Sequence, residues 1–192
     1  MRHDLVALHT GPTTPGGFTD PFEMLGACHE RIRTFAAVAR RLATETAPAS
    51  QVADAARRLH LYFGTALPLH EQDEEETLST ALAGGPESGR SDLLFERLRR
   101  EHREIEHVVG DLLPRWDAVA RRPERVVHER TPMLELTEAL SAAFAPHLAM
   151  EEEELFALAR RSLPADRLVL MLAEMRGRRQ PVFAKLQELH RP

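Results

Sequence analysis

Two segments of the chain have nearly the same sequence: residues 70–78 read HEQDEEETL, and residues 147–155 read HLAMEEEEL. Each begins with a histidine and has a glutamate four residues later: His70 and Glu74 in the first, His147 and Glu151 in the second. Residues four apart lie one turn apart on the same face of an α-helix. Each pair can therefore direct an imidazole nitrogen and a carboxylate oxygen toward one cation.

A further histidine precedes each segment on a separate amphipathic stretch. Residues 27–32 read ACHERI and contain His29, and residues 100–105 read REHREI and contain His102. The order His, then His-x-x-x-Glu, thus occurs twice along the chain. The repeat predicts two halves related by a pseudo-twofold axis, each of which supplies three metal ligands.

Apolar residues recur through most of the chain with the spacing of α-helices. Capping residues, prolines and glycines mark the expected helix ends. The expected helices run from Asp20 to before Pro48, from Ser50 to Gly84, from Ser91 to Arg121, from Thr131 beyond Leu158, and from Pro164 to Gly177. Because the sequence lacks the turn signals that separate β-strands, the pattern predicts an all-α fold.

The predicted architecture is an antiparallel up-down-up-down four-helix bundle, because four long helices are joined by short connections. The bundle would span residues 20–162. An irregular N-terminal arm would occupy residues 1–19, and a short fifth C-terminal helix with a tail would occupy residues 163–192. The apolar periodicity places the four motif histidines on the faces that pack inward, where bundles build metal sites from facing helices.

Two prolines interrupt the expected helices beside the motif histidines. Pro68 lies two residues before His70, and Pro146 lies directly before His147. A proline inside a helix removes one hydrogen bond and clashes with the carbonyl group four residues back. Local kinks there would tune the angle at which each histidine enters the core. The alternative is a tolerated irregularity without functional effect.

Composition narrows the classes of function. The 192 residues carry a net charge of −5, and the arginines are dispersed among acidic residues, so no nucleic-acid surface is expected. A single cysteine, Cys28, excludes an internal disulfide and fits a reducing compartment. The sequence has no apolar run of membrane-spanning length and no signal-peptide core. We therefore expect a cytoplasmic protein, monomeric or homodimeric, without nucleic-acid or membrane partners.

Six residues form the predicted metal site: His29, His70, Glu74, His102, His147 and Glu151. Buried carboxylates are costly unless they are paired or bind metal, and Arg33 is the only obvious alternative partner on these faces. Imidazole and carboxylate ligands without thiolate suit iron, manganese or zinc. Six ligands exceed the needs of one tetrahedral zinc ion but match two ions bridged by Glu74 and Glu151. His29 and His70 would then serve one ion, and the other two histidines the second.

The roles of several neighbours stay open. Glu71 would reach a metal from the side or accept a hydrogen bond from a ligand histidine. Glu106, one turn beyond His102, is a candidate seventh ligand. Tyr62 would ligate metal or carry redox chemistry, although packing or a hydrogen bond is the commoner role. Four acidic residues of the two runs rotate off the ligand face and are expected to be solvated: Glu75, Glu76, Glu152 and Glu153.

The four motifs, in this order and at helix-length spacing, resemble the hemerythrin-like (HHE cation-binding) family over residues 20–160. The resemblance implies a four-helix bundle around a non-haem di-iron site, bridged by carboxylates and, as an option, by an oxo group. Members of this family bind O₂ or respond to oxygen, iron, peroxide or nitric oxide. A small diatomic molecule or a peroxide is therefore the implied ligand.

The chain departs from oxygen-carrying hemerythrins at two positions. Those proteins have a second histidine one turn after the third-helix histidine, where this chain has Glu106. They also have an aspartate five residues after the fourth-helix histidine, whereas here Glu151 lies at four and Glu152 at five. Carboxylate in place of imidazole favours Fe(III) over Fe(II), which argues against a reversible O₂ carrier.

Three hypotheses for function follow from these residues and the resemblance. The first is a di-iron protein that binds or responds to O₂ or reactive oxygen and nitrogen species. The second is a peroxidase- or catalase-like enzyme at the same site. The third is an interaction module that reports iron or oxygen to a partner through an exposed apolar surface. The fifth helix would supply this surface with Leu168, Leu170, Met171, Leu172 and Met175.

Overall fold

The protein is described here by a computed structural model, which describes residues 17–189 and the side chains as far as Gln180. Most of the predicted N-terminal arm, residues 1–16, and the last three residues of the tail lie outside the described residues. The described part of the chain is helical and contains no β-strand, which confirms the all-α prediction.

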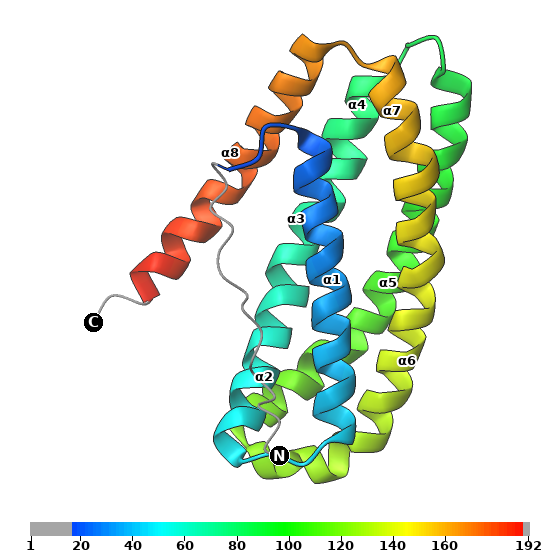
Figure 1. Ribbon diagram of the computed structural model, residues 1–192. Coiled ribbons are helices and arrows are strands. Elements are labelled where there is room, and N and C mark those ends of the chain that lie inside the picture. The colour runs from blue at the N-terminus through cyan, green and yellow to red at the C-terminus, as the bar shows by residue number, and fades with distance from the viewer. Residues whose placement is uncertain (1–16, 190–192) are drawn as a thin grey trace.

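Four antiparallel helical rods form the bundle (Figure 1). The first rod is α1, Pro21–Thr44. The second combines α2 (Ala49–Leu61), η1 (Tyr62–Ala66), α3 (Leu67–Gln72), η2 (Asp73–Leu78) and α4 (Ser79–Leu82). The third is α5, Ser88–Arg121. A 3₁₀ turn, η3 (Pro123–Arg125), leads to the fourth rod, which combines α6 (Val126–Met150), η4 (Glu151–Leu155) and α7 (Phe156–Ser162).

The first helix starts where the sequence predicts, whereas the other three rods start at different residues from those predicted. Asp20 caps α1 as predicted, and its Oδ1 accepts a hydrogen bond from the Phe22 amide at 2.8 Å. The second rod starts at Ala49, one residue before the predicted cap. The prediction for Ser91 is wrong, because its hydroxyl donates to the Ser88 carbonyl within α5 instead of capping the helix. The prediction for Thr131 is also wrong, because the turn at Pro123–Arg125 starts the fourth rod earlier.

The fifth helix is longer and better packed than predicted. α8 spans Ala165–Leu189 and passes through Gly177, where the sequence predicted its end. Glycine weakens a helix by only about 1 kcal/mol relative to alanine, which tertiary contacts can outweigh. α8 packs against α1 and η2 and crosses beside them in Figure 1.

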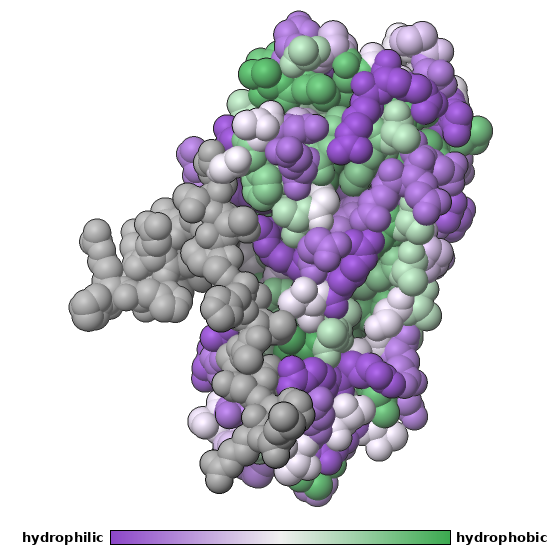
Figure 2. Space-filling model, in the orientation of Figure 1, coloured by the Kyte–Doolittle hydropathy of each residue, from purple (hydrophilic) through white to green (hydrophobic). Residues whose placement is uncertain are grey.

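This packing overturns most of the predicted apolar surface. Three of the five predicted residues, Met171, Leu172 and Met175, are buried against the bundle, and Leu168 is half-buried. Leu170 is exposed as predicted, and its neighbour Val169 is exposed as well. On the face shown in Figure 2, hydrophobic residues gather over the first half of α8.

Two apolar clusters fill the bundle, one on each side of the motif histidines. One includes Ile32, Phe63, Ile105, Trp116 and Phe144. The other includes Leu25, Leu78, Leu98, Leu155 and Phe156, together with the buried face of α8. His29 lies between Leu25 and Ile32 on α1, and His102 lies between Leu98 and Ile105 on α5. The histidines therefore form a polar layer that apolar packing closes off from both ends of the bundle.

Three π-helical turns, in which hydrogen bonds run from i to i+5, interrupt the second and fourth rods. η1 directly precedes Leu67 and Pro68, in agreement with an irregularity at that proline. η2 and η4 follow the two motif histidines and contain Glu74 and Glu151. The two halves of the repeat thus share the same local distortion at the predicted bridging glutamates, and π turns are frequent at functional sites.

Candidate metal centre

The six residues predicted as ligands meet at the middle of the bundle and are almost inaccessible to solvent. Their exposed fractions range from 0% to 2%: His29 0%, His70 2%, Glu74 0%, His102 2%, His147 1% and Glu151 0%. Four different rods contribute, since the residues come from α1, α3 with η2, α5, and α6 with η4. Burial of so many ionisable groups in one layer is costly unless they bind one another or a cation.

The six residues form two overlapping groups, each able to hold one metal ion. One group is His29, His70, Glu74 and Glu151, and the other is Glu74, His102, His147 and Glu151. Within each group, one potential ligand atom per residue lies within 4.8 Å of all the others. The histidines lie in two pairs, with ring centroids 5.1 Å apart for His29 and His70 and 4.8 Å apart for His102 and His147.

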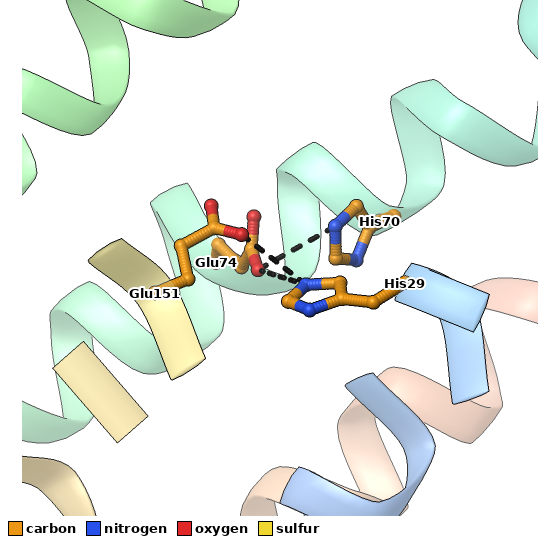
Figure 3. Close-up of side chains that lie close together, drawn as sticks. All are labelled: His29, His70, Glu74 and Glu151. Carbon is orange, nitrogen blue, oxygen red and sulfur yellow. Dashed lines mark ion pairs between the residues drawn. The ribbon is translucent and has the colours of Figure 1, made fainter. Parts of the chain in front are cut away.

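Each glutamate directs its two oxygens toward different histidine pairs. Glu74 Oε1 lies 3.5 Å from His70 Nε2 and 3.8 Å from His29 Nε2, whereas its Oε2 lies 3.5 Å from His102 Nε2. Glu151 Oε2 lies 3.2 Å from His29 Nε2, and its Oε1 lies 2.9 Å from His147 Nε2. Figure 3 shows the first group, with both carboxylates facing the two imidazoles. This is the orientation required of carboxylates that bridge two ions.

The outer nitrogens of three histidines contact carboxylates that sequence reasoning assigned to solvent or overlooked. Glu152 Oε1 lies 2.7 Å from His29 Nδ1, and Glu75 Oε1 lies 2.6 Å from His102 Nδ1. Glu101, which was overlooked, places Oε2 3.0 Å from His147 Nδ1.

The prediction that Glu75 and Glu152 are simply solvated is therefore wrong. Each lies five residues after a motif histidine, and the π turns η2 and η4 bring residues five apart nearer to one line along the helix. Glu76 and Glu153 are exposed, as predicted. A carboxylate on Nδ1 fixes the imidazole tautomer that presents Nε2 to a metal.

Electrostatics within the layer couple the histidines to the two buried glutamates. Burial opposes protonation of His29, but the Glu151 and Glu74 carboxylates outweigh it and raise the pKa of His29 to about 10. The same balance raises the pKa of His102 to about 11. In return, and despite burial, the histidines lower the pKa of Glu74 and hold that of Glu151 well below its usual range. Without metal, protonated histidines would balance the carboxylate charge.

The inner atoms of these residues are poorly hydrogen-bonded to one another, which favours a bound metal. Several of their inner atoms are fully buried without a well-formed hydrogen bond: Nε2 of His29, His70 and His102, and both carboxylate oxygens of Glu74 and Glu151. Arg33, the alternative partner for the glutamates, pairs with Glu30 and Glu152 at the surface instead. Buried polar atoms are rarely left unpaired in proteins, and one cation in each group would satisfy all of these atoms.

Residues 20–189 match the family of the Hemerythrin HHE cation binding domain. The chain belongs to this family. A protein of Haemophilus influenzae, known only as uncharacterized, is similar to it, with 27% identity over 169 residues that cover 85% of this chain and 92% of that protein. The family match includes α8, which the motifs alone did not reach. The HHE domain is a cation-binding domain, and the two groups of buried His and Glu residues can hold metal.

Three further candidates occupy different positions around the HHE centre. Glu71 is buried, its Oε1 lacks a hydrogen bond, and burial raises its pKa to about 7, but it belongs to neither ligand group. Glu106 is exposed to solvent and also belongs to neither group. Tyr62 stacks on Phe35 with centroids 4.0 Å apart and donates to the Cys28 carbonyl at 3.4 Å. The structure therefore gives Tyr62 the packing role.

The two halves of the sequence repeat differ in the residue that precedes the first histidine of each half. Cys28 precedes His29 where Glu101 precedes His102, so the thiol occupies the position that corresponds to the carboxylate beside His147. Burial raises the pKa of Cys28, but His70 and the charges of Arg179 and Arg31 outweigh burial and lower it overall. The two halves of the centre therefore differ in the polarity of the groups behind their histidines.

None of the described helices is both long and apolar enough to cross a membrane. His60, His107 and His128, which lie outside the motifs, are exposed.

Proposed function

We propose that this HHE domain binds two iron ions and binds or responds to O₂, peroxide or nitric oxide at that centre. The observation that supports this most directly is the orientation of Glu74 and Glu151. Each carboxylate presents one oxygen to the pair His29 and His70 and faces the other pair with its second oxygen. Imidazole and carboxylate ligands without thiolate suit iron.

The chain's own residues would position and tune the ions. Two imidazoles together with the carboxylates of Glu74 and Glu151 would hold each ion. The iron would bind the small molecule and supply or accept electrons. Glu152, Glu75 and Glu101 would hold three of the imidazoles in place and increase their basicity. The two apolar clusters exclude water from the layer.

The symmetry of the site favours a sensor or reactive centre over an oxygen carrier. Both groups contain two histidines and the same two glutamates. Glu106, which stands where oxygen-carrying hemerythrins have a further histidine, is exposed. With fewer imidazoles among the candidate ligands, the ferric state is favoured.

A buried carboxyl group favours peroxide turnover as the second candidate function. Glu71 lies within the electrostatic reach of His102 and His70 and has no hydrogen-bond partner for Oε1. Disproportionation of two molecules of hydrogen peroxide gives one O₂ and two water molecules, which requires protons to move but no external reductant. A positioned carboxyl group can carry such protons. Failure of iron-loaded protein to release O₂ from peroxide would remove this candidate.

Metal stoichiometry tests the proposed function. Protein purified without chelator, or loaded anaerobically with Fe(II), should contain two irons per chain. His102→Ala should lower this number, whereas His107→Ala, an exposed histidine of the same helix, should leave it unchanged. Two irons retained in His102→Ala would contradict the ligand assignment, and zinc alone in every preparation would contradict iron as the metal.

A further inference from the structure

The C-terminal helix is attached to the bundle directly beside the candidate metal centre. Arg178 and Arg179 of α8 both form ion pairs with Asp73, whose side chain is fully buried. Asp73 is the first residue of η2 and directly precedes Glu74. The two guanidinium groups therefore hold the backbone segment that carries one of the two bridging carboxylates.

Hydrogen bonds extend this attachment along η2. Arg178 Nη2 donates to Thr77 Oγ1 at 3.0 Å and to Glu174 Oε1 at 3.1 Å, and the Thr77 hydroxyl donates to Glu174 at 2.8 Å. Glu76 Oε2 lies 3.5 Å from Arg178 Nη2. α8 thus contacts three of the six residues of η2 through polar groups.

Arg179 also reaches a second element that carries a ligand. Its side chain is buried, its Nη1 donates to the Met175 carbonyl at 3.0 Å, and its Nη2 lies 3.7 Å from Cys28 Sγ. Cys28 directly precedes His29 on α1. One guanidinium group therefore contacts the chain neighbours of both His29 and Glu74, which belong to the same ligand group.

We propose that α8 acts as a clamp on the metal centre, so that docking of α8 through Asp73 and Arg179 and occupancy of the metal site stabilise each other. This inference rests on the proposed function, since it assumes that the six residues bind metal. Asp73 and Arg179 are positioning residues: neither belongs to a ligand group, and both act through the segments that carry Glu74 and His29.

The physical reason lies in the π turn and the buried charge. A π turn is rare in proteins, which suggests that η2 depends on contacts outside its own helix. If α8 leaves, Asp73 loses both guanidinium partners, and breaking a buried ion pair is strongly destabilising. η2 would then rearrange and move Glu74 away from the position that faces both histidine pairs. Linkage requires the reverse effect to have the same size, so metal binding must favour docked α8 by an equal factor.

The clamp can be tested by iron affinity in the full-length chain. Fe(II) affinity would be measured anaerobically by competition with a chelator for wild type, Asp73→Asn and Arg179→Gln. Both variants should bind iron more weakly, by roughly 5- to 150-fold, the usual range of coupling between sites. Arg167→Gln is the matched control, because Arg167 lies on α8 but donates to the Thr80 carbonyl at 3.5 Å. It should bind iron as wild type does.

Hydrogen exchange provides a readout that needs no variant. Amides of α8 in the wild-type protein should exchange more slowly with iron than without it. Unchanged exchange in α8 together with unchanged affinity in both variants would overturn the clamp. If a variant fails to fold, the wild-type exchange decides alone. A wild-type protein that binds no iron would refute the proposed function itself, a result distinct from iron binding that is indifferent to α8.

Discussion

Glu152 allows a direct test of how the centre is built. Its Oε1 lies 2.7 Å from His29 Nδ1 and 2.8 Å from Arg33 Nη2. Glu152→Ala would leave His29 without the acceptor that fixes its tautomer and ring orientation. Because Glu152 belongs to neither ligand group, we expect two irons to bind still at saturating metal, but with lower affinity.

The size of the loss follows from the position of the carboxylate. Removing the outer partner of a ligand histidine typically weakens metal binding by roughly 10- to 100-fold. The Glu152 side chain is 37% exposed, so water compensates for part of the lost interaction. We therefore expect the lower limit, about tenfold, which corresponds to about 1.4 kcal/mol. Glu152→Gln keeps an acceptor oxygen for the Nδ1–H group and should lose less.

Chelator competition with Fe(II) measures this effect, and Glu153→Ala is its matched control. Glu153 is the next residue of the same run, carries the same charge and is exposed. We expect a loss of affinity in Glu152→Ala and none in Glu153→Ala. Equal losses would mean that net charge alone matters, and unchanged affinity in both would mean that the contact with His29 has no effect. Either result would refute the assigned role of Glu152.

Four further predictions concern the pH dependence of iron affinity, the pH dependence of stability, core packing and the ligand set. Iron affinity should rise with pH, because pKa values of about 10 for His29 and about 11 for His102 mean that metal displaces protons; binding without proton release would contradict this. In the metal-free protein, pairing of protonated His29 and His102 with the glutamates stabilises the fold fully below about pH 6.5. This stabilisation is lost as the pH rises through about 10 and about 11. The chelated protein should therefore melt at a lower temperature above these pH values. Trp116→Ala should cost about 3–5 kcal/mol in the free energy of unfolding, since Trp116 is fully buried, and chemical denaturation checks this. Glu71→Gln should keep the wild-type iron content by elemental analysis, and loss of an ion would make Glu71 a ligand.

Much of the centre could be read from local sequence because helix geometry depends on near neighbours. The spacing of four predicts that His70 and Glu74 share a helix face, whatever the rest of the chain does. The apolar period around His29 predicts that it faces inward. Together with the family match, these features determine an all-α bundle with its His and Glu residues in one buried layer.

Only the tertiary structure shows which carboxylates contact the outer nitrogens of the candidate ligand histidines. Glu75 contacts His102 from another rod, across 27 residues of sequence, and Glu152 contacts His29 across 123. These contacts depend on the π turns η2 and η4, which form through packing. Ordinary α-helical periodicity instead predicts that both carboxylates face solvent.

The docking of α8 was likewise beyond the sequence. Nothing local to Arg178 or Arg179 indicates that they pair with Asp73, more than a hundred residues earlier. Sequence periodicity reports which face of a helix is apolar, whereas only the assembled bundle determines which neighbour covers it. Spacing along each helix therefore determined which residues are candidate ligands, whereas contacts between helices determined which carboxylates support them, because orientation within one helix is local and contact between two is not.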